Sequence, residues 1–500
     1  MSKKHIVHVI VALLLPIVIF SQAPPPEDIN AGINKGLEFL TGQQNEDGSW
    51  GVFHTVEDPD GKQHLASERV ALTGFALTKL CERAYELQYN SPYEPDYIYS
   101  EHVIRGYEFL LNLADTYGEG RGIFIYETPD PDYRHHETYN AAVALMAIAA
   151  SGTPEHIIAS PNPLVNGKRV IELLYEMIAY FAWSQNKTLN PDNSPHPCFG
   201  GWNYEPGYEV PNDRSDNSIT GFVVLALRYA ESIGVEIPPA LKDRLSVWID
   251  FIQNDENGGS GYTDPNDPEQ GQNLLRTGNL LFQLAFLGHG IESPRVQHAL
   301  EFIGNNWNVT DNESLGWWNN LLAMYCLKQG FESYDLDVIK VDGIGRPWHD
   351  DFAAFLLERQ MEDGSWHDLL WGAELPNVVS TAWALLILER KGSPPTNILT
   401  TDRLASSQQE FELLQNYPNP FNPETQITFH IKEKGGVFLA VYNVRGQLVR
   451  ILAEGQHAAG VYSVIWNGLD EHANLLPSGL YIYKLTVNDY VSIRKMTFMK

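Results

Sequence analysis

Carboxyl, imidazole, guanidinium and indole groups stand at the beginnings of several apolar segments of this 500-residue chain. Glu137, Asp213 and Asp216 are the candidate catalytic residues. Two carboxyl groups, such as those of Glu137 and Asp213, can serve as general acid and base in the cleavage of a glycosidic bond. The candidate ligand-binding residues are Arg69, His135, His136, Arg276, Trp317 and Trp318. A polar and aromatic rim of this kind over an apolar shaft suits a ligand with a ring or chain and hydroxyl or carboxyl groups. For Trp317 and Trp318, packing between structural units is an equal alternative.

These residues can meet only if the apolar segments that follow them lie side by side. Helical periodicity predicts about six pairs of helices, each an amphipathic helix followed by a more apolar one. The pairs are 36–40 with 71–77, 105–110 with 140–146, 171–183 with 220–227, 245–253 with 280–287, 296–303 with 321–327, and 352–360 with 381–388. Because helices that are apolar all round must be enclosed, the second helices should form an inner ring. We therefore expect an all-α α/α toroid whose inner helices begin around one mouth, with an open solenoid as the alternative.

An internal repeat supports this arrangement. Residues 44–50 recur almost unchanged at 360–366, and residues 253–262 match them loosely. In each copy the outer helix should end at the glutamine, Asp-Gly should turn the chain through a left-handed position, and the tryptophan should lie back on the turn. The motif should thus connect one helix end to the next unit, which makes Asp47 and Asp363 structural residues.

Composition narrows the range of partners. The chain has 63 acidic and 34 basic residues and a formal charge of -29, which disfavours binding to nucleic acid or to anionic lipid. Its three cysteines, Cys81, Cys198 and Cys326, are too few and too scattered for a disulfide framework or a zinc cage. The residue pattern predicts no metal and no cofactor.

The two ends of the chain indicate export and a second domain. Residues 1–23 have basic residues ahead of a short apolar run, as a secretory signal peptide has, and Pro16 disfavours the alternative of a membrane anchor. No membrane span is expected in the mature chain. We expect the toroid at residues 30–390, a linker at 391–410 and an all-β domain at 411–500. In that domain, strand patterns at 426–431, 437–443, 461–466, 480–487 and 492–499 predict a small immunoglobulin-like sandwich.

The chain resembles two known families, each at a separate set of motifs. The repeats at 44–50 and 360–366 resemble those of the prenyltransferase and squalene-cyclase superfamily, over roughly residues 33–389. Segments 417–423, 441–446, 466–468 and 477–481 resemble the sorting domain of the bacterial type IX secretion pathway, and also the immunoglobulin-like part of flagellar hook-capping proteins. The second resemblance implies that the type IX machinery is a partner and that the protein is secreted or attached to the cell surface.

The first resemblance bears on the chemistry. Class II cyclases of that superfamily protonate an alkene with the central carboxyl of an Asp-x-Asp-Asp-Thr motif, which falls here on residues 216–220. Ser218 takes the place of the proton donor, and a hydroxyl group cannot do that work. We expect Asp216 or Ser218 to cap the helix instead. His196, Cys198 and the pair His135 and His136 do not match the zinc ligands of protein prenyltransferases.

The sequence thus predicts a secreted, two-domain protein whose toroid binds a small molecule or a saccharide in its central cavity, without squalene-type cyclisation. Two alternatives stay open. One is a secreted enzyme that uses rim carboxylates, either a polysaccharide lyase or hydrolase or an unorthodox cyclase or transferase. The other is a structural or adhesion module. Whether the chain is an enzyme is not decided by these residues.

Overall fold

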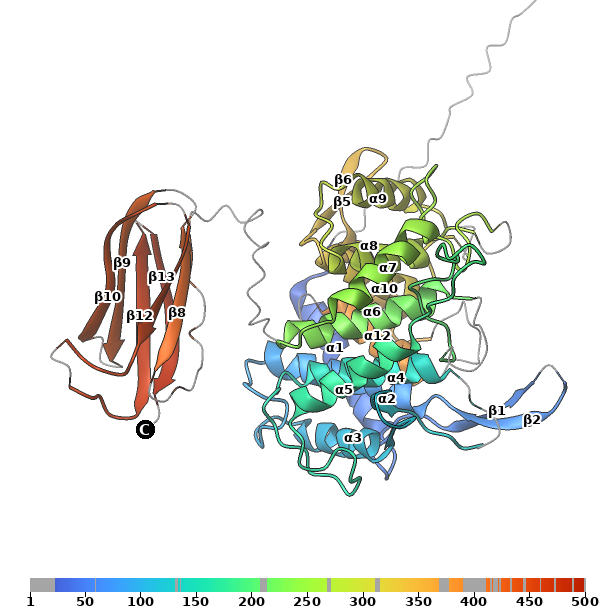
Figure 1. Ribbon diagram of the computed structural model, residues 1–500, viewed down its shortest axis with the longest axis horizontal. Helices are drawn as coiled ribbons and strands as arrows, with labels where there is room; N and C mark the ends of the chain where they lie inside the picture. Colours follow the sequence, from blue (N-terminus) through green and yellow to red (C-terminus); the bar gives the residue numbers. More distant parts are fainter. Residues whose placement is uncertain are drawn as a thin grey trace, which may run out of the picture. The chain divides into compact units, whose positions relative to one another are not determined.

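The computed structural model of the chain divides into two compact units, Met1–Ile398 and Leu399–Lys500 (Figure 1). In the first unit the structure describes residues 23–58, 60–130, 134, 136–206, 214–267, 271–310, 315–367 and 377–389. In the second it describes 411–413, 416, 421, 424–431, 434–443, 447–458, 460–471, 474–487 and 490–498. The expected signal peptide, apart from Ala23, and the expected linker lie outside these residues.

The described part of the first unit contains six hairpins, each made of an outer helix followed by an inner one. The outer helices are α1 (Pro26–Gly42), α3 (Ser100–Asn112), α5 (Val170–Ser184), α7 (Pro239–Ile252), α9 (Pro294–Asn306) and α11 (Trp348–Arg359). The inner helices are α2 (Arg69–Glu86), α4 (Glu137–Ala150), α6 (Asn217–Ser232), α8 (Leu274–Phe286), α10 (Leu321–Glu332) and α12 (Asn377–Leu388). None of the described helices combines the length and the apolar composition needed to cross a membrane.

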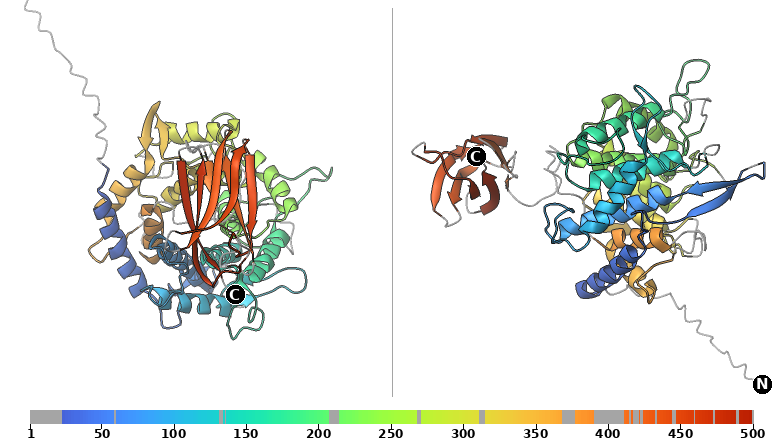
Figure 2. Two further views of the ribbon diagram at one scale, coloured as in Figure 1. Left: turned by 90° about the vertical axis from the view of Figure 1, so that its left-hand side faces the viewer. Right: turned by 90° about the horizontal axis from the view of Figure 1, so that it is seen from below.

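The six hairpins close into a ring. Each inner helix contacts the next one, and α12 returns to α2. The outer helices surround them, as the left view of Figure 2 shows. Burial explains the two layers, because α4 buries 13 of its 14 residues whereas the outer helices keep a polar face in water. The predicted α/α toroid is confirmed, and the open solenoid is wrong.

Aromatic side chains meet on the axis of the ring. The Phe75 ring of α2 has its centroid 5.9 Å from that of Phe222 on α6, 6.2 Å from Tyr325 on α10 and 5.7 Å from Trp383 on α12. Helices α6 and α10 are not neighbours of α2 in the ring, so these contacts cross it. The shaft is apolar at this depth, as expected, but side chains occupy it. A ligand would therefore have to bind nearer to the mouth.

The repeated motif makes the same hydrogen bonds in both clear copies. The indole Nε1 of Trp50 donates to the Leu40 oxygen at 2.7 Å, and that of Trp366 donates to the Leu356 oxygen at 2.8 Å. The turn glycines Gly48 and Gly364 have φ of +88° and +93°. Asp47 and Asp363 each accept a hydrogen bond from the backbone of the serine two residues on. The predicted geometry of the motif is confirmed.

The glutamine of each copy joins its unit to the next outer helix. Gln44 donates to the His102 oxygen of α3 at 2.9 Å, and Gln253 donates to the Arg295 oxygen of α9 at 3.0 Å. A copy that the sequence did not reveal starts at Gln185, which donates to the Leu241 oxygen of α7 at 3.1 Å. Its tryptophan is Trp202, whose indole donates to the Phe181 oxygen at 3.0 Å. An insertion between Gln185 and Trp202 hides this copy from a search by spacing.

Three short hairpins interrupt the helices, and none of them was predicted. They pair β1 (Phe53–Glu57) with β2 (Gln63–Ser67), β3 (Ala114–Asp115) with β4 (Phe124–Ile125), and β5 (Val338–Val341) with β6 (Ile344–Pro347). The first extends away from the helices of its unit (Figure 1). It leads directly into α2 and so stands beside the mouth.

The second unit is a β domain whose named strands pair antiparallel. Its strands are β7 (Phe411–Leu413), β8 (Thr425–Ile431), β9 (Gly435–Asn443), β10 (Leu448–His457), β11 (Gly460–Trp466), β12 (Gly479–Val487) and β13 (Tyr490–Phe498). They form a four-stranded sheet of order β10-β9-β12-β13 and a three-stranded sheet of order β11-β8-β7. Phe429, Trp466 and Tyr483 lie in the core that the sheets enclose. The predicted second, all-β domain is confirmed.

Candidate functional site

The first part of the mouth is formed by side chains near the beginnings of α2, α4 and α6. The His136 Nδ1 lies 2.8 Å from Glu68 Oε1, and the His136 ring lies over the Tyr204 ring with centroids 4.4 Å apart. His136 is the N-cap residue of α4 and has a left-handed backbone, with φ of +56°. This conformation holds its ring across the boundary between two units. His136 and Glu68 keep a third and a quarter of their side chains exposed, so both are accessible.

A second tyrosine continues the mouth toward α8. The side chains of Tyr204 and Tyr262 act on each other's titration, and burial raises the pKa of both hydroxyl groups. Two guanidinium groups lie over the Tyr262 ring, that of Arg276 with its Cζ 5.0 Å from the centroid and that of Arg214 at 5.5 Å. The fold therefore places side chains from three consecutive units in one row, which we call the mouth row and which consists of His136, Tyr204, Tyr262 and Arg276.

Asp216 lies beside the mouth row and caps α6, as expected. Its Oδ1 accepts a hydrogen bond of 2.8 Å from the Ile219 N–H. Its Oδ2 is buried and has no hydrogen-bond partner within the described part of the chain. Burial raises the pKa of Asp216 to about 7, although the N–H groups of the first helical turn and the charge of Arg214 oppose this shift. The result is a carboxyl group that is partly protonated at neutral pH.

Glu137 points away from the mouth row, between α4 and α5. It is fully buried, and its carboxylate accepts hydrogen bonds from the Tyr117 hydroxyl at 2.6 Å and the Tyr180 hydroxyl at 2.9 Å. Arg134 pairs with the same carboxylate at 2.5 Å. Glu205, which accepts from the His136 N–H at 3.0 Å, is nearer to the mouth row. Burial, together with the charge of Glu137, raises the pKa of Glu205 to about 8.

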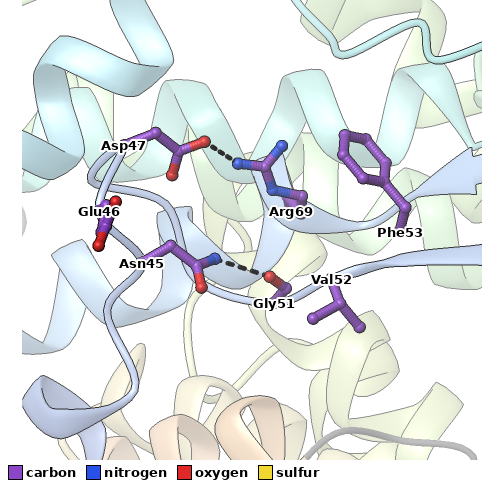
Figure 3. A pocket seen from close by; sticks show the side chains of 7 residues that line it. All are labelled: Asn45, Glu46, Asp47, Gly51, Val52, Phe53 and Arg69. Atoms are coloured by element: carbon purple, nitrogen blue, oxygen red, sulfur yellow. Dashed lines mark hydrogen bonds and ion pairs between the residues drawn. The ribbon is translucent and has the colours of Figure 1, made fainter.

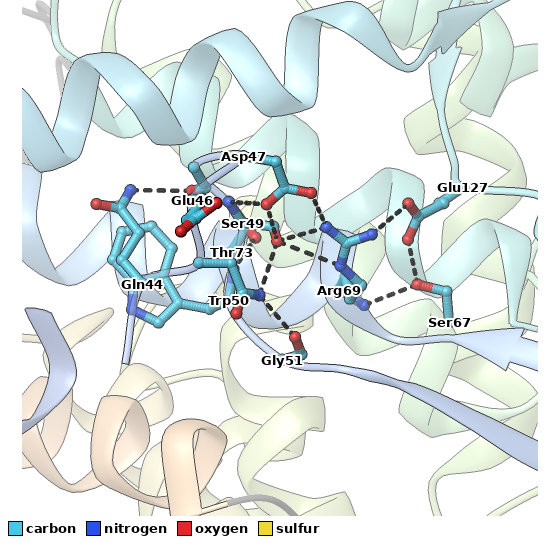
Figure 4. Close-up of polar contacts among 12 residues, drawn as sticks. Gln44, Glu46, Asp47, Ser49, Trp50, Gly51, Ser67, Arg69, Thr73 and Glu127 are labelled. Carbon is cyan, nitrogen blue, oxygen red and sulfur yellow. Dashed lines mark hydrogen bonds and ion pairs between the residues drawn. The ribbon is translucent and has the colours of Figure 1, made fainter. Parts of the chain in front are cut away.

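The Arg69 side chain is paired with residues that hold the fold together. Its guanidinium pairs with Asp47 and, at 2.8 Å, with Glu127, and it also donates to Ser49 (Figure 4). The Phe53 and Phe109 rings lie 4.7 and 4.9 Å from its Cζ. Arg69 therefore ties the first repeat turn to the β1–β2 hairpin and to the loop that holds Glu127. Since these partners use its donors and its faces, Arg69 is not placed to hold a ligand in this conformation.

A shallow pocket of about 430 Å³ lies over this arginine (Figure 3). Its lining residues are Asn45, Glu46, Asp47, Gly51, Val52, Phe53 and Arg69. Asn45 is itself engaged, because its Nδ2 donates to the Gly51 oxygen at 2.8 Å. The Asn45, Asp47 and Arg69 side chains of the pocket are therefore already paired within the fold.

The two candidate tryptophans differ. Trp317 is buried, and its indole donates to the Trp307 oxygen at 3.0 Å, which is the packing role that the sequence left open. Trp318 is half-buried and stacks on Trp317 with centroids 5.2 Å apart. His135 and Asp213 lie outside the described residues. The structure thus brings together His136, Arg276 and Asp216, and it places Arg69, Glu137 and Trp317 within packed or fully paired surroundings.

Sequence reasoning missed Tyr204, Tyr262, Arg214 and Glu205 as members of the site. A signal for the two tyrosines exists. The backbone N–H of Trp202 donates to Thr220 and that of Ser260 donates to Thr277, as that of Trp50 donates to Thr73. Tyr204 lies two positions after Trp202, and Tyr262 lies two positions after Ser260. An alignment of the copies by these threonines would have shown two tyrosines at equivalent places.

Over the described ranges, no three His, Cys, Asp or Glu side chains are grouped so that they could hold a metal ion. His196 and Cys198 do approach each other, with Nδ1 and Sγ 2.9 Å apart. This pair lies in the insertion between Gln185 and Trp202, shortly before Tyr204 in the sequence.

Comparison with known proteins finds a family model for part of the second unit and several solved structures that are similar to the chain. Residues 421–490 match the family model of the FlgD Ig-like domain. The chain is similar to a type II terpene cyclase from Scytonema in complex with geranylgeranyl dihydroxybenzoate, at 14% identity and a TM-score of 0.38, over 74% of this chain and 98% of that one. It is also similar to a family 76 glycoside hydrolase from a bovine Bacteroides thetaiotaomicron strain, at 12% identity and a TM-score of 0.46, over 72% and 77%.

A third structure belongs to a possible member of glycoside hydrolase family 105 from Klebsiella pneumoniae. It is 9% identical with a TM-score of 0.41, over 77% of this chain and 98% of that one. No curated protein matches the chain. None of these likenesses says what this chain binds, so its function has to be argued from the mouth row.

Proposed function

We propose that the toroid binds a saccharide, or a small ligand with a similar hydroxylated ring, at the mouth row. The observation that carries this proposal is the row itself, in which a 4.4 Å ring contact, an electrostatic interaction between two tyrosine side chains and a 5.0 Å arginine contact join three units. Aromatic faces bind the apolar faces of sugar rings, and the polar edges of the same side chains can bind hydroxyl groups.

The packing of the axis favours a short or surface-bound ligand over a long apolar chain. Phe75 and the rings that it meets occupy the shaft, so an extended isoprenoid would have to displace buried aromatic side chains. Ser218 also stands where the cyclase proton donor is expected. Both features argue against squalene-type cyclisation. Incubation of the toroid with squalene should give no polycyclic product.

Binding can be tested with the exported form of the full chain. We would measure the migration of the protein in gels that contain individual soluble polysaccharides, and titrate the best one by calorimetry. Replacement of Tyr262 by Ala should weaken binding about tenfold or more, because an aromatic platform is lost. Tyr175→Ala is the matched control, since Tyr175 is an exposed tyrosine on α5. Absence of binding to every polysaccharide would contradict the proposal and leave the structural or adhesion role.

A second candidate function is catalysis at the same place, and Asp216 is the observation that favours it. A buried carboxyl group with a pKa of about 7, one oxygen of which has no hydrogen-bond partner among the described residues, is suited to be a general acid. Incubation with soluble polysaccharides should then yield new reducing ends or unsaturated products. Asp216→Asn should abolish this activity, while Asp363→Asn should not. Glu137→Gln and Asp213→Asn test the other two candidate carboxyl groups.

We further propose that the chain is exported by its N-terminal segment and carried across the outer membrane by the type IX machinery. The signal-like pattern at residues 1–23 and the immunoglobulin-like match at 421–490 support this route. Expression in a bacterium with an intact type IX pathway should place the protein outside the cell, and inactivation of the pathway should retain it in the periplasm. Retention of the full chain in the cytoplasm would contradict the proposal.

A further inference from the structure

We propose that the pocket over Arg69 is a further binding site, and that its ligand is a cationic sugar such as an amino sugar. This inference goes beyond the proposed function, because the pocket shares no lining residue with the mouth row. Its volume of about 430 Å³ suits a small ligand, since such sites measure about 300–1,000 Å³. Val52 and Phe53 line it and are 68% and 44% exposed, so an apolar surface is available for contact (Figure 3).

Phe53 is held in place as a platform for a ring. The Arg69 guanidinium lies over the Phe53 ring, with its Cζ 4.7 Å from the centroid. Arg69 is in turn paired with Asp47 and Glu127, which restrains its side chain. The backbone of Phe53 pairs with that of Ser67 in the β1–β2 hairpin. The exposed part of the ring can therefore bind the apolar face of a sugar, and a preformed platform loses little entropy on binding.

Glu46 supplies a carboxylate that the fold does not use. Arg105 donates to the backbone oxygen of Glu46 at 3.1 Å, but within the described residues the Glu46 carboxylate forms no hydrogen bond or ion pair. The next residue, Asp47, has a half-exposed side chain that pairs with Arg69 and accepts from Ser49. An ammonium group in the pocket would thus meet one unpaired and one paired carboxylate. An anionic sugar would be repelled by Glu46 and would have to compete for Arg69.

The last repeat turn provides an internal comparison. Glu362 has the position of Glu46 in that turn and is likewise exposed. Asn377 has the position of Arg69, because each lies four residues before the threonine that accepts a hydrogen bond from the tryptophan N–H of its motif. The last turn therefore has the same carboxylate without the arginine that supports Phe53. Glu362 is a matched control for Glu46, since the loss of either changes the net charge equally.

A pair of oligosaccharides that differ in N-acetylation provides the test. The tetrasaccharide of glucosamine and its fully N-acetylated form have the same backbone, and acetylation removes the positive charge. In calorimetric titrations at mildly acidic pH, we expect the full chain to bind the glucosamine form about fivefold more tightly, equivalent to ~1 kcal/mol, and the difference to shrink as NaCl is added. Glu46→Gln should reduce this preference to about twofold or less. Glu362→Gln should leave it unchanged, whereas an attraction caused only by the net charge of -29 would respond equally to both variants.

The platform is tested by Phe53→Ala, which should weaken the binding of both forms about fivefold. Leu65→Ala is the matched control, since Leu65 is a 43% exposed apolar residue of β2 outside the pocket lining. Tyr262→Ala should leave the preference for the glucosamine form unchanged. Loss of the preference in that variant would place the amine at the mouth row and overturn the assignment to the pocket.

The remaining outcomes separate this inference from the proposed function. Equal binding of the two forms, or an equal response of Glu46→Gln and Glu362→Gln, would overturn the pocket as a site for an amino sugar and leave the saccharide site at the mouth row standing. Failure to bind the glucosamine form would overturn it in the same way. The proposed function would be overturned only by a failure to bind every polysaccharide.

Discussion

The side-chain amide of Gln360 donates a 2.9 Å hydrogen bond to the backbone oxygen of Gly32, so the last repeat of the toroid holds its first helix. The same amide donates to the Gly364 oxygen of its own turn at 3.0 Å. Gln253 makes the equivalent pair of bonds inside the ring, to Gly258 and Arg295. The contact between the last and the first unit is therefore made by the same two hydrogen bonds as a contact between consecutive units.

Replacement of Gln360 by Ala should loosen this closure. The loss of two partly buried hydrogen bonds should lower the free energy of unfolding of the toroid by about 1–3 kcal/mol. Hydrogen exchange measured by mass spectrometry should show faster exchange in α1, because its contact with the last unit is weakened. Gln253→Ala is the control, with a similar loss of stability but increased exchange in α9. If both variants changed α1 equally, the closing role of Gln360 would be disproved.

The turn glycine of the motif should be irreplaceable. Gly48 has a φ of +88°, and a Cβ there would collide with the backbone oxygen of Arg105. We expect Gly48→Ala to cost at least ~2 kcal/mol, because both the left-handed backbone and the contact with α3 oppose a side chain. Gly167→Ala is the matched control, since Gly167 has a φ of +79° with open space around it. It should cost only about 1 kcal/mol in the same urea titration.

Much of the ring could be predicted because its signals are local. Apolar periodicity marks the helices, and Gln44 and Trp50 reappear at the same spacing in Gln360 and Trp366. Where an insertion separates the partners, as between Gln185 and Trp202, spacing fails although the hydrogen bonds are the same. Strand β10 was also missed, because it contains Gly455 and is interrupted by register shifts.

The candidate site was less predictable than the fold. Alignment of the helix starts brings His136 and Asp216 to one end of the ring, because the start of a helix fixes the position of its backbone. It could not foresee the direction of a side chain, so Glu137 was expected at the rim and instead lies between tyrosines. It also omitted Tyr204, whose place depends on the loop before α6. Loop residues carry no periodicity, and their position is set by tertiary contacts.

Asp216 should make the stability of the toroid depend on pH. Its pKa rises from an ordinary 3.8 to about 7 in the folded protein, so between these values the folded state binds more protons than the unfolded state. Stability should therefore fall as pH rises from 4 to 7, by on the order of 2–4 kcal/mol from this group. Asp216→Asn keeps a good N-cap and should remove this part of the slope in urea titrations.

Asp363→Asn serves as the control for the pH slope. Hydrogen bonds from the side chain and backbone of Ser365 lower the pKa of Asp363, so its contribution has the opposite sign. That contribution changes only below the ordinary pKa of 3.8, so this variant should leave the decline of stability between pH 4 and 7 nearly unchanged. The assignment to Asp216 would fail if Asp216→Asn had the same slope as the wild-type protein.

His64 should stabilise the β1–β2 hairpin most strongly at low pH, through its contacts with Asp58 and Asp130. Its Nδ1 lies 2.8 Å from Asp130 and its Nε2 lies 3.0 Å from Asp58, and only a protonated ring can donate to both. These bonds, first that of Asp130 and then that of Asp58, raise the pKa of His64 against the opposing charge of Lys62. The stabilisation is complete below the ordinary pKa of about 6.5 and is lost as pH rises through the raised value.

Hydrogen exchange can measure how strongly His64 stabilises the β1–β2 hairpin. After correction for intrinsic rates, amides of residues 53–67 should be less protected at pH 9 than at pH 6. In His64→Gln the protection should be low at both values, because a neutral amide cannot replace the doubly donating ring. Unchanged protection of the hairpin across this range in the wild-type protein would show that His64 does not hold it.

Phe75 provides a test of where a ligand binds. Phe75→Ala removes a fully buried ring that contacts three others, and should lower the free energy of unfolding by about 3–5 kcal/mol. Phe251→Ala, in the half-buried outer layer of α7, should cost less. Because the mouth row lies outside this packed layer, polysaccharide affinity of the folded Phe75→Ala variant should change by no more than about twofold. A larger loss of affinity would mean that the ligand reaches the axis at the depth of Phe75, and so would place the site inside the shaft.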